Sequence, residues 1–123
     1  VPKYSGADRA NNEQLSKAAA AHASDIGANG LVQHESSDGT KPLDRISQYY
    51  QGNATAENIA AGTNKAFYIV RQLLIDQDVP TYGHRRNILS SKYNRIGVAI
   101  HEHTKYKYCC VQDFADDKGE AIN

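Results

Sequence analysis

The sequence contains no methionine and no tryptophan, and its only cysteines are the neighbours Cys109 and Cys110. Because Val1 cannot be a natural initiator, we expect a processed or trimmed chain from which any signal peptide has been removed. Adjacent residues of a strand point to opposite faces, so we expect no disulfide between Cys109 and Cys110. The sequence therefore offers no disulfide framework that would indicate a compartment.

An excess of one charge and a long apolar run are also missing. The chain has 14 basic and 14 acidic residues, so its overall charge predicts neither a nucleic-acid partner nor an anionic membrane partner. No apolar run approaches the ~18–20 residues of a transmembrane helix. With 123 residues, 23% of them charged and 40% hydrophobic, the composition is that of one ordinary globular domain.

The first half of the chain predicts two helices separated by a polar loop. From residue 11 to about residue 28 the sequence is rich in alanine, has the apolar spacing of one helix face, and ends at an Asn-Gly pair. Residues 33–42 form a polar loop, and Pro42 suits the first position of a short helix that runs to about Tyr50.

The second half predicts a long helix followed by a hairpin. The type of segment 56–60 stays open, and Thr63 or Asn64 offers an N-cap for the helix after it. The apolar stripe of that helix would comprise Ala66, Ile69, Val70 and Leu73. Alternating apolar residues at 96–100, a turn, and a second run over 106–115 predict an antiparallel hairpin.

These elements predict an α+β layered domain with helices around a small antiparallel sheet. We expect residues 1–10 to form a terminal arm, residues 11–115 to form a single domain, and residues 116–123 to form a polar tail that frays.

Four polar residues could form a site although no short motif joins them. Two imidazoles and two carboxylates suit a divalent cation or general acid–base chemistry, whereas the plain alternative is helix caps and surface polar groups. The four are His34, Glu57, Asp76 and His84. We interpret His22, on an apolar helix face, as a packed core residue. His101 and His103 share a strand face and could hold a metal, but we expect a solvated hairpin end.

Residues 15–115 resemble the CAP superfamily of cysteine-rich secretory proteins, antigen 5 and pathogenesis-related proteins, in the manner of its compact bacterial and protist members. The residues that carry the resemblance are His34 with SSDG (36–39), RI (45–46), AENIA (56–60), GHRRNIL (83–89), IGVA (96–99) and VQDFA (111–115). The family's tryptophan is absent, with Leu73 near its position, and Ala56 replaces a glycine. The disulfides of animal members are missing.

The resemblance implies an α–β–α sandwich with an open cleft lined by His34, His84, Glu57 and Asp76, where Asp76 replaces the usual glutamate. Gly83 would allow a tight entry that sets His84 opposite His34. The two imidazoles would ligate Zn²⁺ or a similar ion weakly, with water completing the coordination. Glu57 and Asp76 would then orient the rings or the bound water.

Three functions remain open. We expect a secreted, monomeric, non-enzymatic module that binds a divalent cation, and the resemblance adds a lipid, a sterol, or a host or partner protein. The first alternative is a metal-dependent hydrolase of peptidase type, in which Glu57, with Asp76, would serve a metal-bound water. The second is a structural or adhesive surface module in which the four residues only hold loops together.

Overall fold

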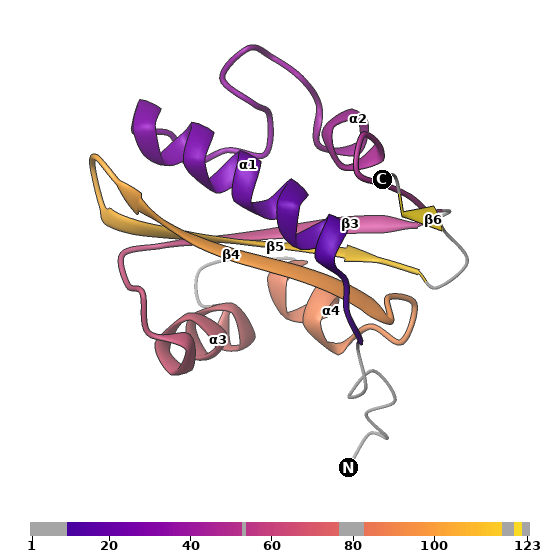
Figure 1. Cartoon of the computed structure of the whole chain (residues 1–123). Helices are drawn as coiled ribbons and strands as arrows, with labels where there is room; N and C mark the ends of the chain where they lie inside the picture. Colours follow the sequence, from indigo (N-terminus) through magenta and orange to yellow (C-terminus); the bar gives the residue numbers. More distant parts are fainter. Residues whose placement is uncertain (1–9, 53, 77–82, 117–119, 122–123) are drawn as a thin grey trace.

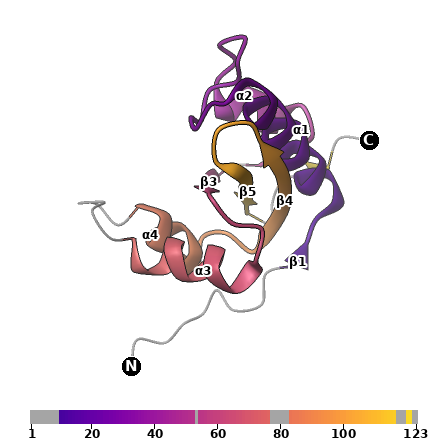
Figure 2. The ribbon, with the colours of Figure 1, turned by 90° about the vertical axis from the view of Figure 1, so that its left-hand side faces the viewer.

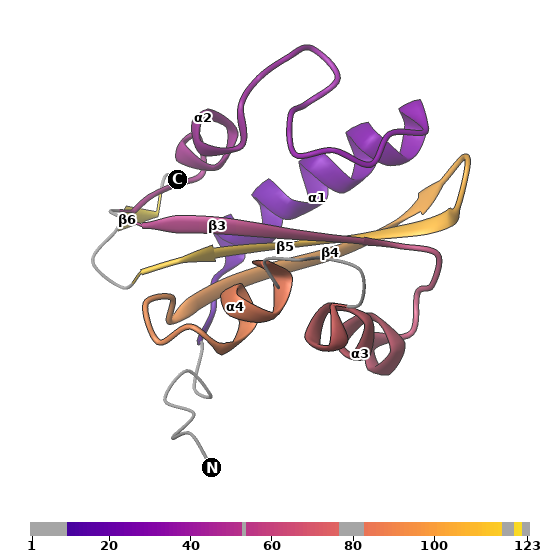
Figure 3. The same ribbon diagram turned by 180° about the vertical axis from the view of Figure 1, so that it is seen from behind.

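The computed structural model describes residues 10–52, 54–76, 83–116 and 120–121. These residues form the α+β layered domain that the sequence pattern predicts, in the α–β–α arrangement that the resemblance implies. Helices α1 (Glu13–Asn29) and α2 (Pro42–Ser47) cover one face of a sheet, and α3 (Ala66–Ile75) and α4 (Gly83–Leu89) lie on the other (Figures 1 and 3). The end-on view in Figure 2 separates the two helical layers.

The main sheet has four strands in the order β1-β4-β5-β3. The predicted hairpin is formed by β4 (Arg95–His103) and β5 (Lys107–Ala115). Segment 56–60, whose type the sequence left open, lies within β3 (Thr55–Ala61), which pairs antiparallel with β5 and forms one edge of the sheet. The short β1 (Ala10–Asn11) pairs parallel with β4 at the other edge.

A second, two-stranded sheet lies near the chain end. It joins β2 (Tyr50–Gln51) to β6 (Glu120–Ala121). Helix α2 ends at Ser47 and not at about Tyr50 as expected, since Tyr50 belongs to β2. Most of the expected arm, and residues 117–119 and 122–123 of the expected tail, lie outside the described residues.

Helix α1 supplies most of the buried contact on its side of the sheet. The Asn12 side chain caps it by accepting from Leu15 N at 3.0 Å, and Gly30 ends it. The helix can lie close to β4 because Gly97 has no side chain. A Cβ at this position would overlap the backbone of Leu15 and Ser16. Its buried face comprises Leu15, Ala18, Ala19, His22, Ala23, Ile26 and Gly27.

Helix α3 is packed much less fully. It buries Ile69 and Leu73, whereas Ala66 and Val70, predicted in the same stripe, are exposed. Lys65 occupies the N-cap position without a side-chain cap, in place of Thr63 or Asn64. Because α3 is apolar on more than one side and buries only these two residues, the rest of its apolar surface stays exposed.

The cysteines confirm the alternation of β5. Cys109 packs in the core cluster beneath α1, and Cys110 packs with Ile69 and Leu73 of α3. Both thiols are free and buried. Within the described residues, none of the helices has the length and apolar character needed to cross a bilayer.

Candidate functional site

The four candidate residues form two histidine–carboxylate pairs. His34, in the loop between α1 and α2, contacts Glu57 of β3, with 2.9 Å between Nδ1 and Oε2. His84, near the start of α4, contacts Asp76, with 2.8 Å between Nδ1 and Oδ1. The structure therefore joins each ring to one acid, in the combination that a ring-orienting carboxylate requires.

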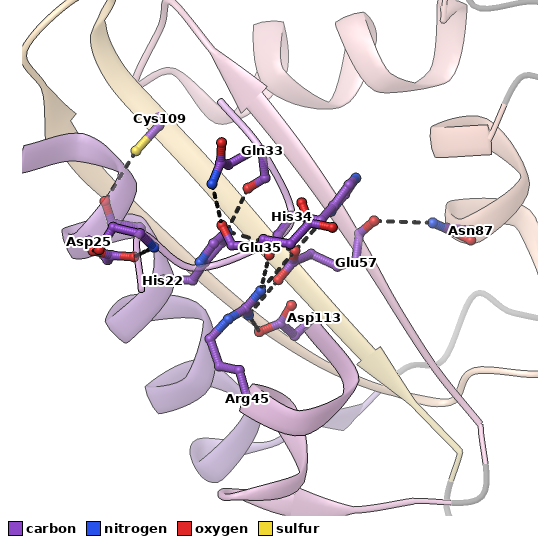
Figure 4. A network of polar contacts seen from close by, with 12 residues as sticks. His22, Asp25, Gln33, His34, Glu35, Arg45, Glu57, Asn87, Cys109 and Asp113 are labelled. Atoms are coloured by element: carbon purple, nitrogen blue, oxygen red, sulfur yellow. Dashed lines mark hydrogen bonds and ion pairs between the residues drawn. The ribbon is translucent and has the colours of Figure 1, made fainter. Parts of the chain in front are cut away.

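In the first pair, Glu57 is fixed by a buried cation that the sequence analysis did not assign to the site. Arg45 of α2 donates from Nη1 to Glu57 Oε1 at 2.7 Å and from Nη2 to Oε2 at 3.2 Å. It also donates from Nη2 to the carbonyl of His34 at 2.7 Å. Arg45 thus holds both the carboxylate and the backbone of the loop that bears the ring (Figure 4).

These contacts set the charges of the first pair. Burial alone would raise the pKa of Glu57, but hydrogen bonds from His34 and Arg45, together with the Arg45 charge, lower it to about 2. The hydrogen bond to Glu57 raises the pKa of His34 above its ordinary value, against the opposing effect of burial. Glu57 is therefore a permanent anion at neutral pH, and it favours the protonated form of the His34 ring.

A second buried acid lies beside Glu57. Asp113 of β5 is the cross-strand neighbour of Glu57 and is fully buried. Burial, reinforced by the nearby Glu57 carboxylate, raises the pKa of Asp113 well above its ordinary value, so its neutral form is favoured. Arg45 Nη1 lies 3.8 Å from Asp113 Oδ2.

His22 belongs to this buried cluster and is the packed core histidine that the sequence predicts. Its side chain is fully buried, and Nε2 donates to the carbonyl of Gln33 at 2.8 Å. The same nitrogen lies 3.9 Å from Glu57 Oε2. Burial lowers the pKa of His22, so the ring is neutral where Arg45 already supplies the positive charge.

In the second pair, Asp76 is held by backbone rather than by another charge. Its Oδ2 accepts from His84 N at 3.0 Å and from Arg85 N at 3.3 Å, so this side chain caps the start of α4. Asp76 itself follows α3 in a left-handed conformation with φ 50°. The Asp76 carboxylate thus links the two helices and orients the imidazole.

The two pairs are linked across β3. Glu57 and Asn58 are adjacent in this strand, so their side chains point to opposite faces. Glu57 meets His34 on one side, and Asn58 donates from Nδ2 to the carbonyl of His84 at 3.1 Å on the other. Asn87 of α4 donates to Asn58 Oδ1 at 2.8 Å and to the Glu57 carbonyl at 3.4 Å.

Both rings are partly exposed, and each turns its Nδ1 to a buried carboxylate. The His34 and His84 side chains are 48% and 29% exposed, whereas the carboxylates of Glu57 and Asp76 are buried. In the described part of the chain neither Nε2 has a hydrogen-bond partner. A cavity of about 390 Å³ is lined by His84, Asp76 and residues of α3 and β3, but His34 and Glu57 are not among its described lining residues.

The donor set does not form a closed metal centre within the described residues. With Nδ1–H donated to a carboxylate, each ring keeps the Nε2 lone pair that a metal needs. Among residues 10–52, 54–76, 83–116 and 120–121, no three His, Cys, Asp or Glu side chains are grouped to hold an ion. At most the two imidazoles, with water, would coordinate the ion.

The hairpin-end histidines behave differently from each other. His101 is exposed, as the sequence predicts for a solvated end. The prediction is wrong for His103, which is buried. Its Nε2 donates to the carbonyl of Leu31 at 2.8 Å. Its Nδ1 accepts from Lys105 N and Tyr106 N, each at 3.1 Å, so both nitrogens close the turn and none is left for a metal.

Comparisons with known proteins agree with this architecture. The family model of the cysteine-rich secretory proteins (CAP) matches residues 9–114. No curated protein sequence matches the chain.

Two solved structures have similar folds. An outer surface protein from Borrelia burgdorferi is 24% identical with a TM-score of 0.71, over 88% of this chain and 77% of that one. An extracellular protein containing an SCP domain from Bacillus anthracis is 23% identical with a TM-score of 0.72, over 89% of this chain. This chain spans 34% of the Bacillus protein.

Proposed function

The chain belongs to the cysteine-rich secretory protein (CAP) family, and from this premise we propose that it is an extracellular, non-enzymatic module that binds a divalent cation through His34 and His84. The observation that carries the proposal is that both rings contact a buried carboxylate through the same nitrogen, Nδ1. Each ring is partly exposed, and neither Nε2 has a hydrogen-bond partner among the described residues.

The expected ligand is Zn²⁺ or a similar ion, bound weakly. Neutral imidazole is a ligand for such ions, and the carboxylates behind the rings would increase the basicity of Nε2. With two protein ligands the ion would exchange readily and keep bound water. Because the Glu57 contact raises the pKa of His34, protons compete for this ring at a higher pH than for an ordinary histidine.

The charges of the acids favour binding over hydrolysis. A general base works best when its pKa is near the working pH, whereas that of Glu57 is lowered to about 2 and both of its oxygens accept hydrogen bonds. The pKa of Asp76 is also lowered: contacts with His84 and Arg85 outweigh the effect of burial. Neither acid is suited to take a proton from water.

Location and further ligands are part of the same proposal. The family description and the names of the two similar structures refer to secreted, extracellular or outer-surface proteins, which supports a location outside the cell. A lipid, a sterol or a partner protein would be an additional ligand, as membership of the CAP family suggests.

Zinc titration by calorimetry at about pH 7.5 tests the proposal. His34→Ala and His84→Ala should each weaken binding, and the double variant should abolish it, whereas His101→Ala, an exposed histidine elsewhere, is the matched control. Zinc at 100 times its dissociation constant should raise the free energy of unfolding by about 2.7 kcal/mol in the parent protein. Equal stabilisation of the double variant would exclude these ligands, and a double variant that does not fold would indicate the structural role.

A further inference from the structure

The outward side of α3 is apolar although nothing in the described chain covers it. Phe67 is 73% exposed, and Tyr68, Val70 and Ile75 are each more than two-fifths exposed. Phe67, Val70, Leu74 and Ile75 line one shallow groove of about 310 Å³ together with Arg71. These residues recur at helical spacing on the side of α3 opposite Ile69 and Leu73, so the helix has two apolar sides and only one is buried.

The exposed charged side chains that the structure describes on α3, on α4 and beside them are of one sign. Every exposed charged side chain described between residues 62 and 90 is basic, namely Lys65, Arg71 and Arg86. Asp76, the acid described in that range, is buried against His84. In the layer across the sheet the exposed acids Glu13, Glu35, Asp38 and Asp44 outnumber the exposed bases Lys17 and Lys41. The overall balance of charge therefore conceals an asymmetry between the two layers.

We propose that α3 is an interfacial docking helix, which lies on an anionic lipid bilayer with Phe67, Val70 and Ile75 among the headgroups. Apolar side chains flanked by Lys and Arg are what such a helix requires, and Tyr68 suits the same interface. The acidic α1–α2 layer then faces away from the bilayer (Figure 2). A second copy of the chain fits less well, because a symmetric contact through the groove would bring the two Arg71 side chains together.

The absence of tryptophan makes a direct test available. Phe67→Trp places a single reporter on α3, and Leu43→Trp places a control reporter on α2, where Leu43 is 59% exposed against 73% for Phe67. With vesicles of phosphatidylcholine and phosphatidylserine, the emission of Phe67→Trp should shift to the blue, and high salt should reverse the shift. Leu43→Trp should not respond, and pure phosphatidylcholine should give a much smaller shift.

Charge reversal separates the electrostatic part. Lys65→Glu with Arg71→Glu should lower the vesicle partition coefficient by at least about tenfold, whereas Lys17→Glu with Lys41→Glu, on the opposite layer, should not lower it. His34→Ala with His84→Ala should bind vesicles as the parent does, so failure of the cation site leaves this result intact.

Three outcomes would overturn the proposal: no response of Phe67→Trp, an equal response of Leu43→Trp, or equal binding to neutral vesicles. A blue shift without vesicles that grows with protein concentration would assign the groove to a second copy and overturn it as well.

Discussion

The two histidine–carboxylate pairs have the same local geometry but are built by different means. Glu57 is fixed by a charge from another element, the guanidinium of Arg45 on α2. Asp76 is fixed by the backbone of the residues that follow it, His84 and Arg85. One carboxylate is therefore part of a buried ionic cluster, and the other is a helix cap.

Because of this difference, removing one carboxylate should affect the stability of the fold much more than removing the other. A buried ion pair is costly to break because the remaining charge is left without water or a partner. A cap at the start of a short helix affects one turn of backbone. The same role toward a ring thus has a large structural consequence at Glu57 and a small one at Asp76.

The largest expected effect is that of Glu57→Ala. It leaves Arg45 buried without its carboxylate, so we expect the free energy of unfolding to fall by about 3–5 kcal/mol, measured by urea denaturation. Glu13→Ala, which removes the exposed partner of Lys17, is the control and should change stability by less than about 1 kcal/mol.

A double replacement tests whether the unpaired charge is the cause. Glu57→Met with Arg45→Met removes both charges, so it should be less destabilising than Glu57→Ala alone. A double variant less stable than the single one would show that Arg45 acts mainly through other contacts, such as the His34 carbonyl.

Asp76→Ala should have an intermediate effect. Loss of the cap on α4 should lower the free energy of unfolding by about 1–2 kcal/mol, and zinc affinity should fall as the His84 ring loses its partner. Asp76→Asn is the matched variant, because its amide oxygen can still accept from the backbone and Asn tolerates a left-handed conformation. A large loss of stability in Asp76→Asn would place Asp76, like Glu57, among the residues that depend on charge.

The sequence predicted the fold well where the pattern is local. The alanine-rich face of α1 and the alternation of β4 each report directly on burial. The pattern of α3 predicted one buried stripe, which is wrong for Ala66 and Val70. Apolar residues lie on both sides of this helix, so only packing distinguishes buried Ile69 from exposed Val70. Segment 56–60 is too short for its own pattern to indicate a type. It is a strand because it pairs with β5, which lies about 50 residues later in the chain.

The candidate site was predictable in its residues but not in its support. The family resemblance placed His34, Glu57, Asp76 and His84. Arg45 enters the resemblance only within the matching dipeptide 45–46, and nothing in the neighbouring sequence indicates its contact with Glu57 of β3, twelve residues later. His103 was misread because its partner, the Leu31 carbonyl, is 72 residues away in the chain.

The smallest expected effect distinguishes the pairs by pH. The contact with Glu57 raises the pKa of His34 in the folded protein, so this contact contributes stability that is complete below the unfolded value of 6.5 and is lost as pH rises through the folded value. Because the ring is half exposed, we expect only a few tenths of a kcal/mol.

His34→Gln should remove this decline, which urea denaturation at a series of pH values above 6.5 would measure without metal. His101→Gln, a change at an exposed ring, should retain it. If the decline persists in His34→Gln, the proton that Glu57 favours is not on this ring. If His34→Gln gains rather than loses stability below pH 6.5, the contact is not stabilising even when His34 is charged, and the loop depends on the Arg45 contact alone.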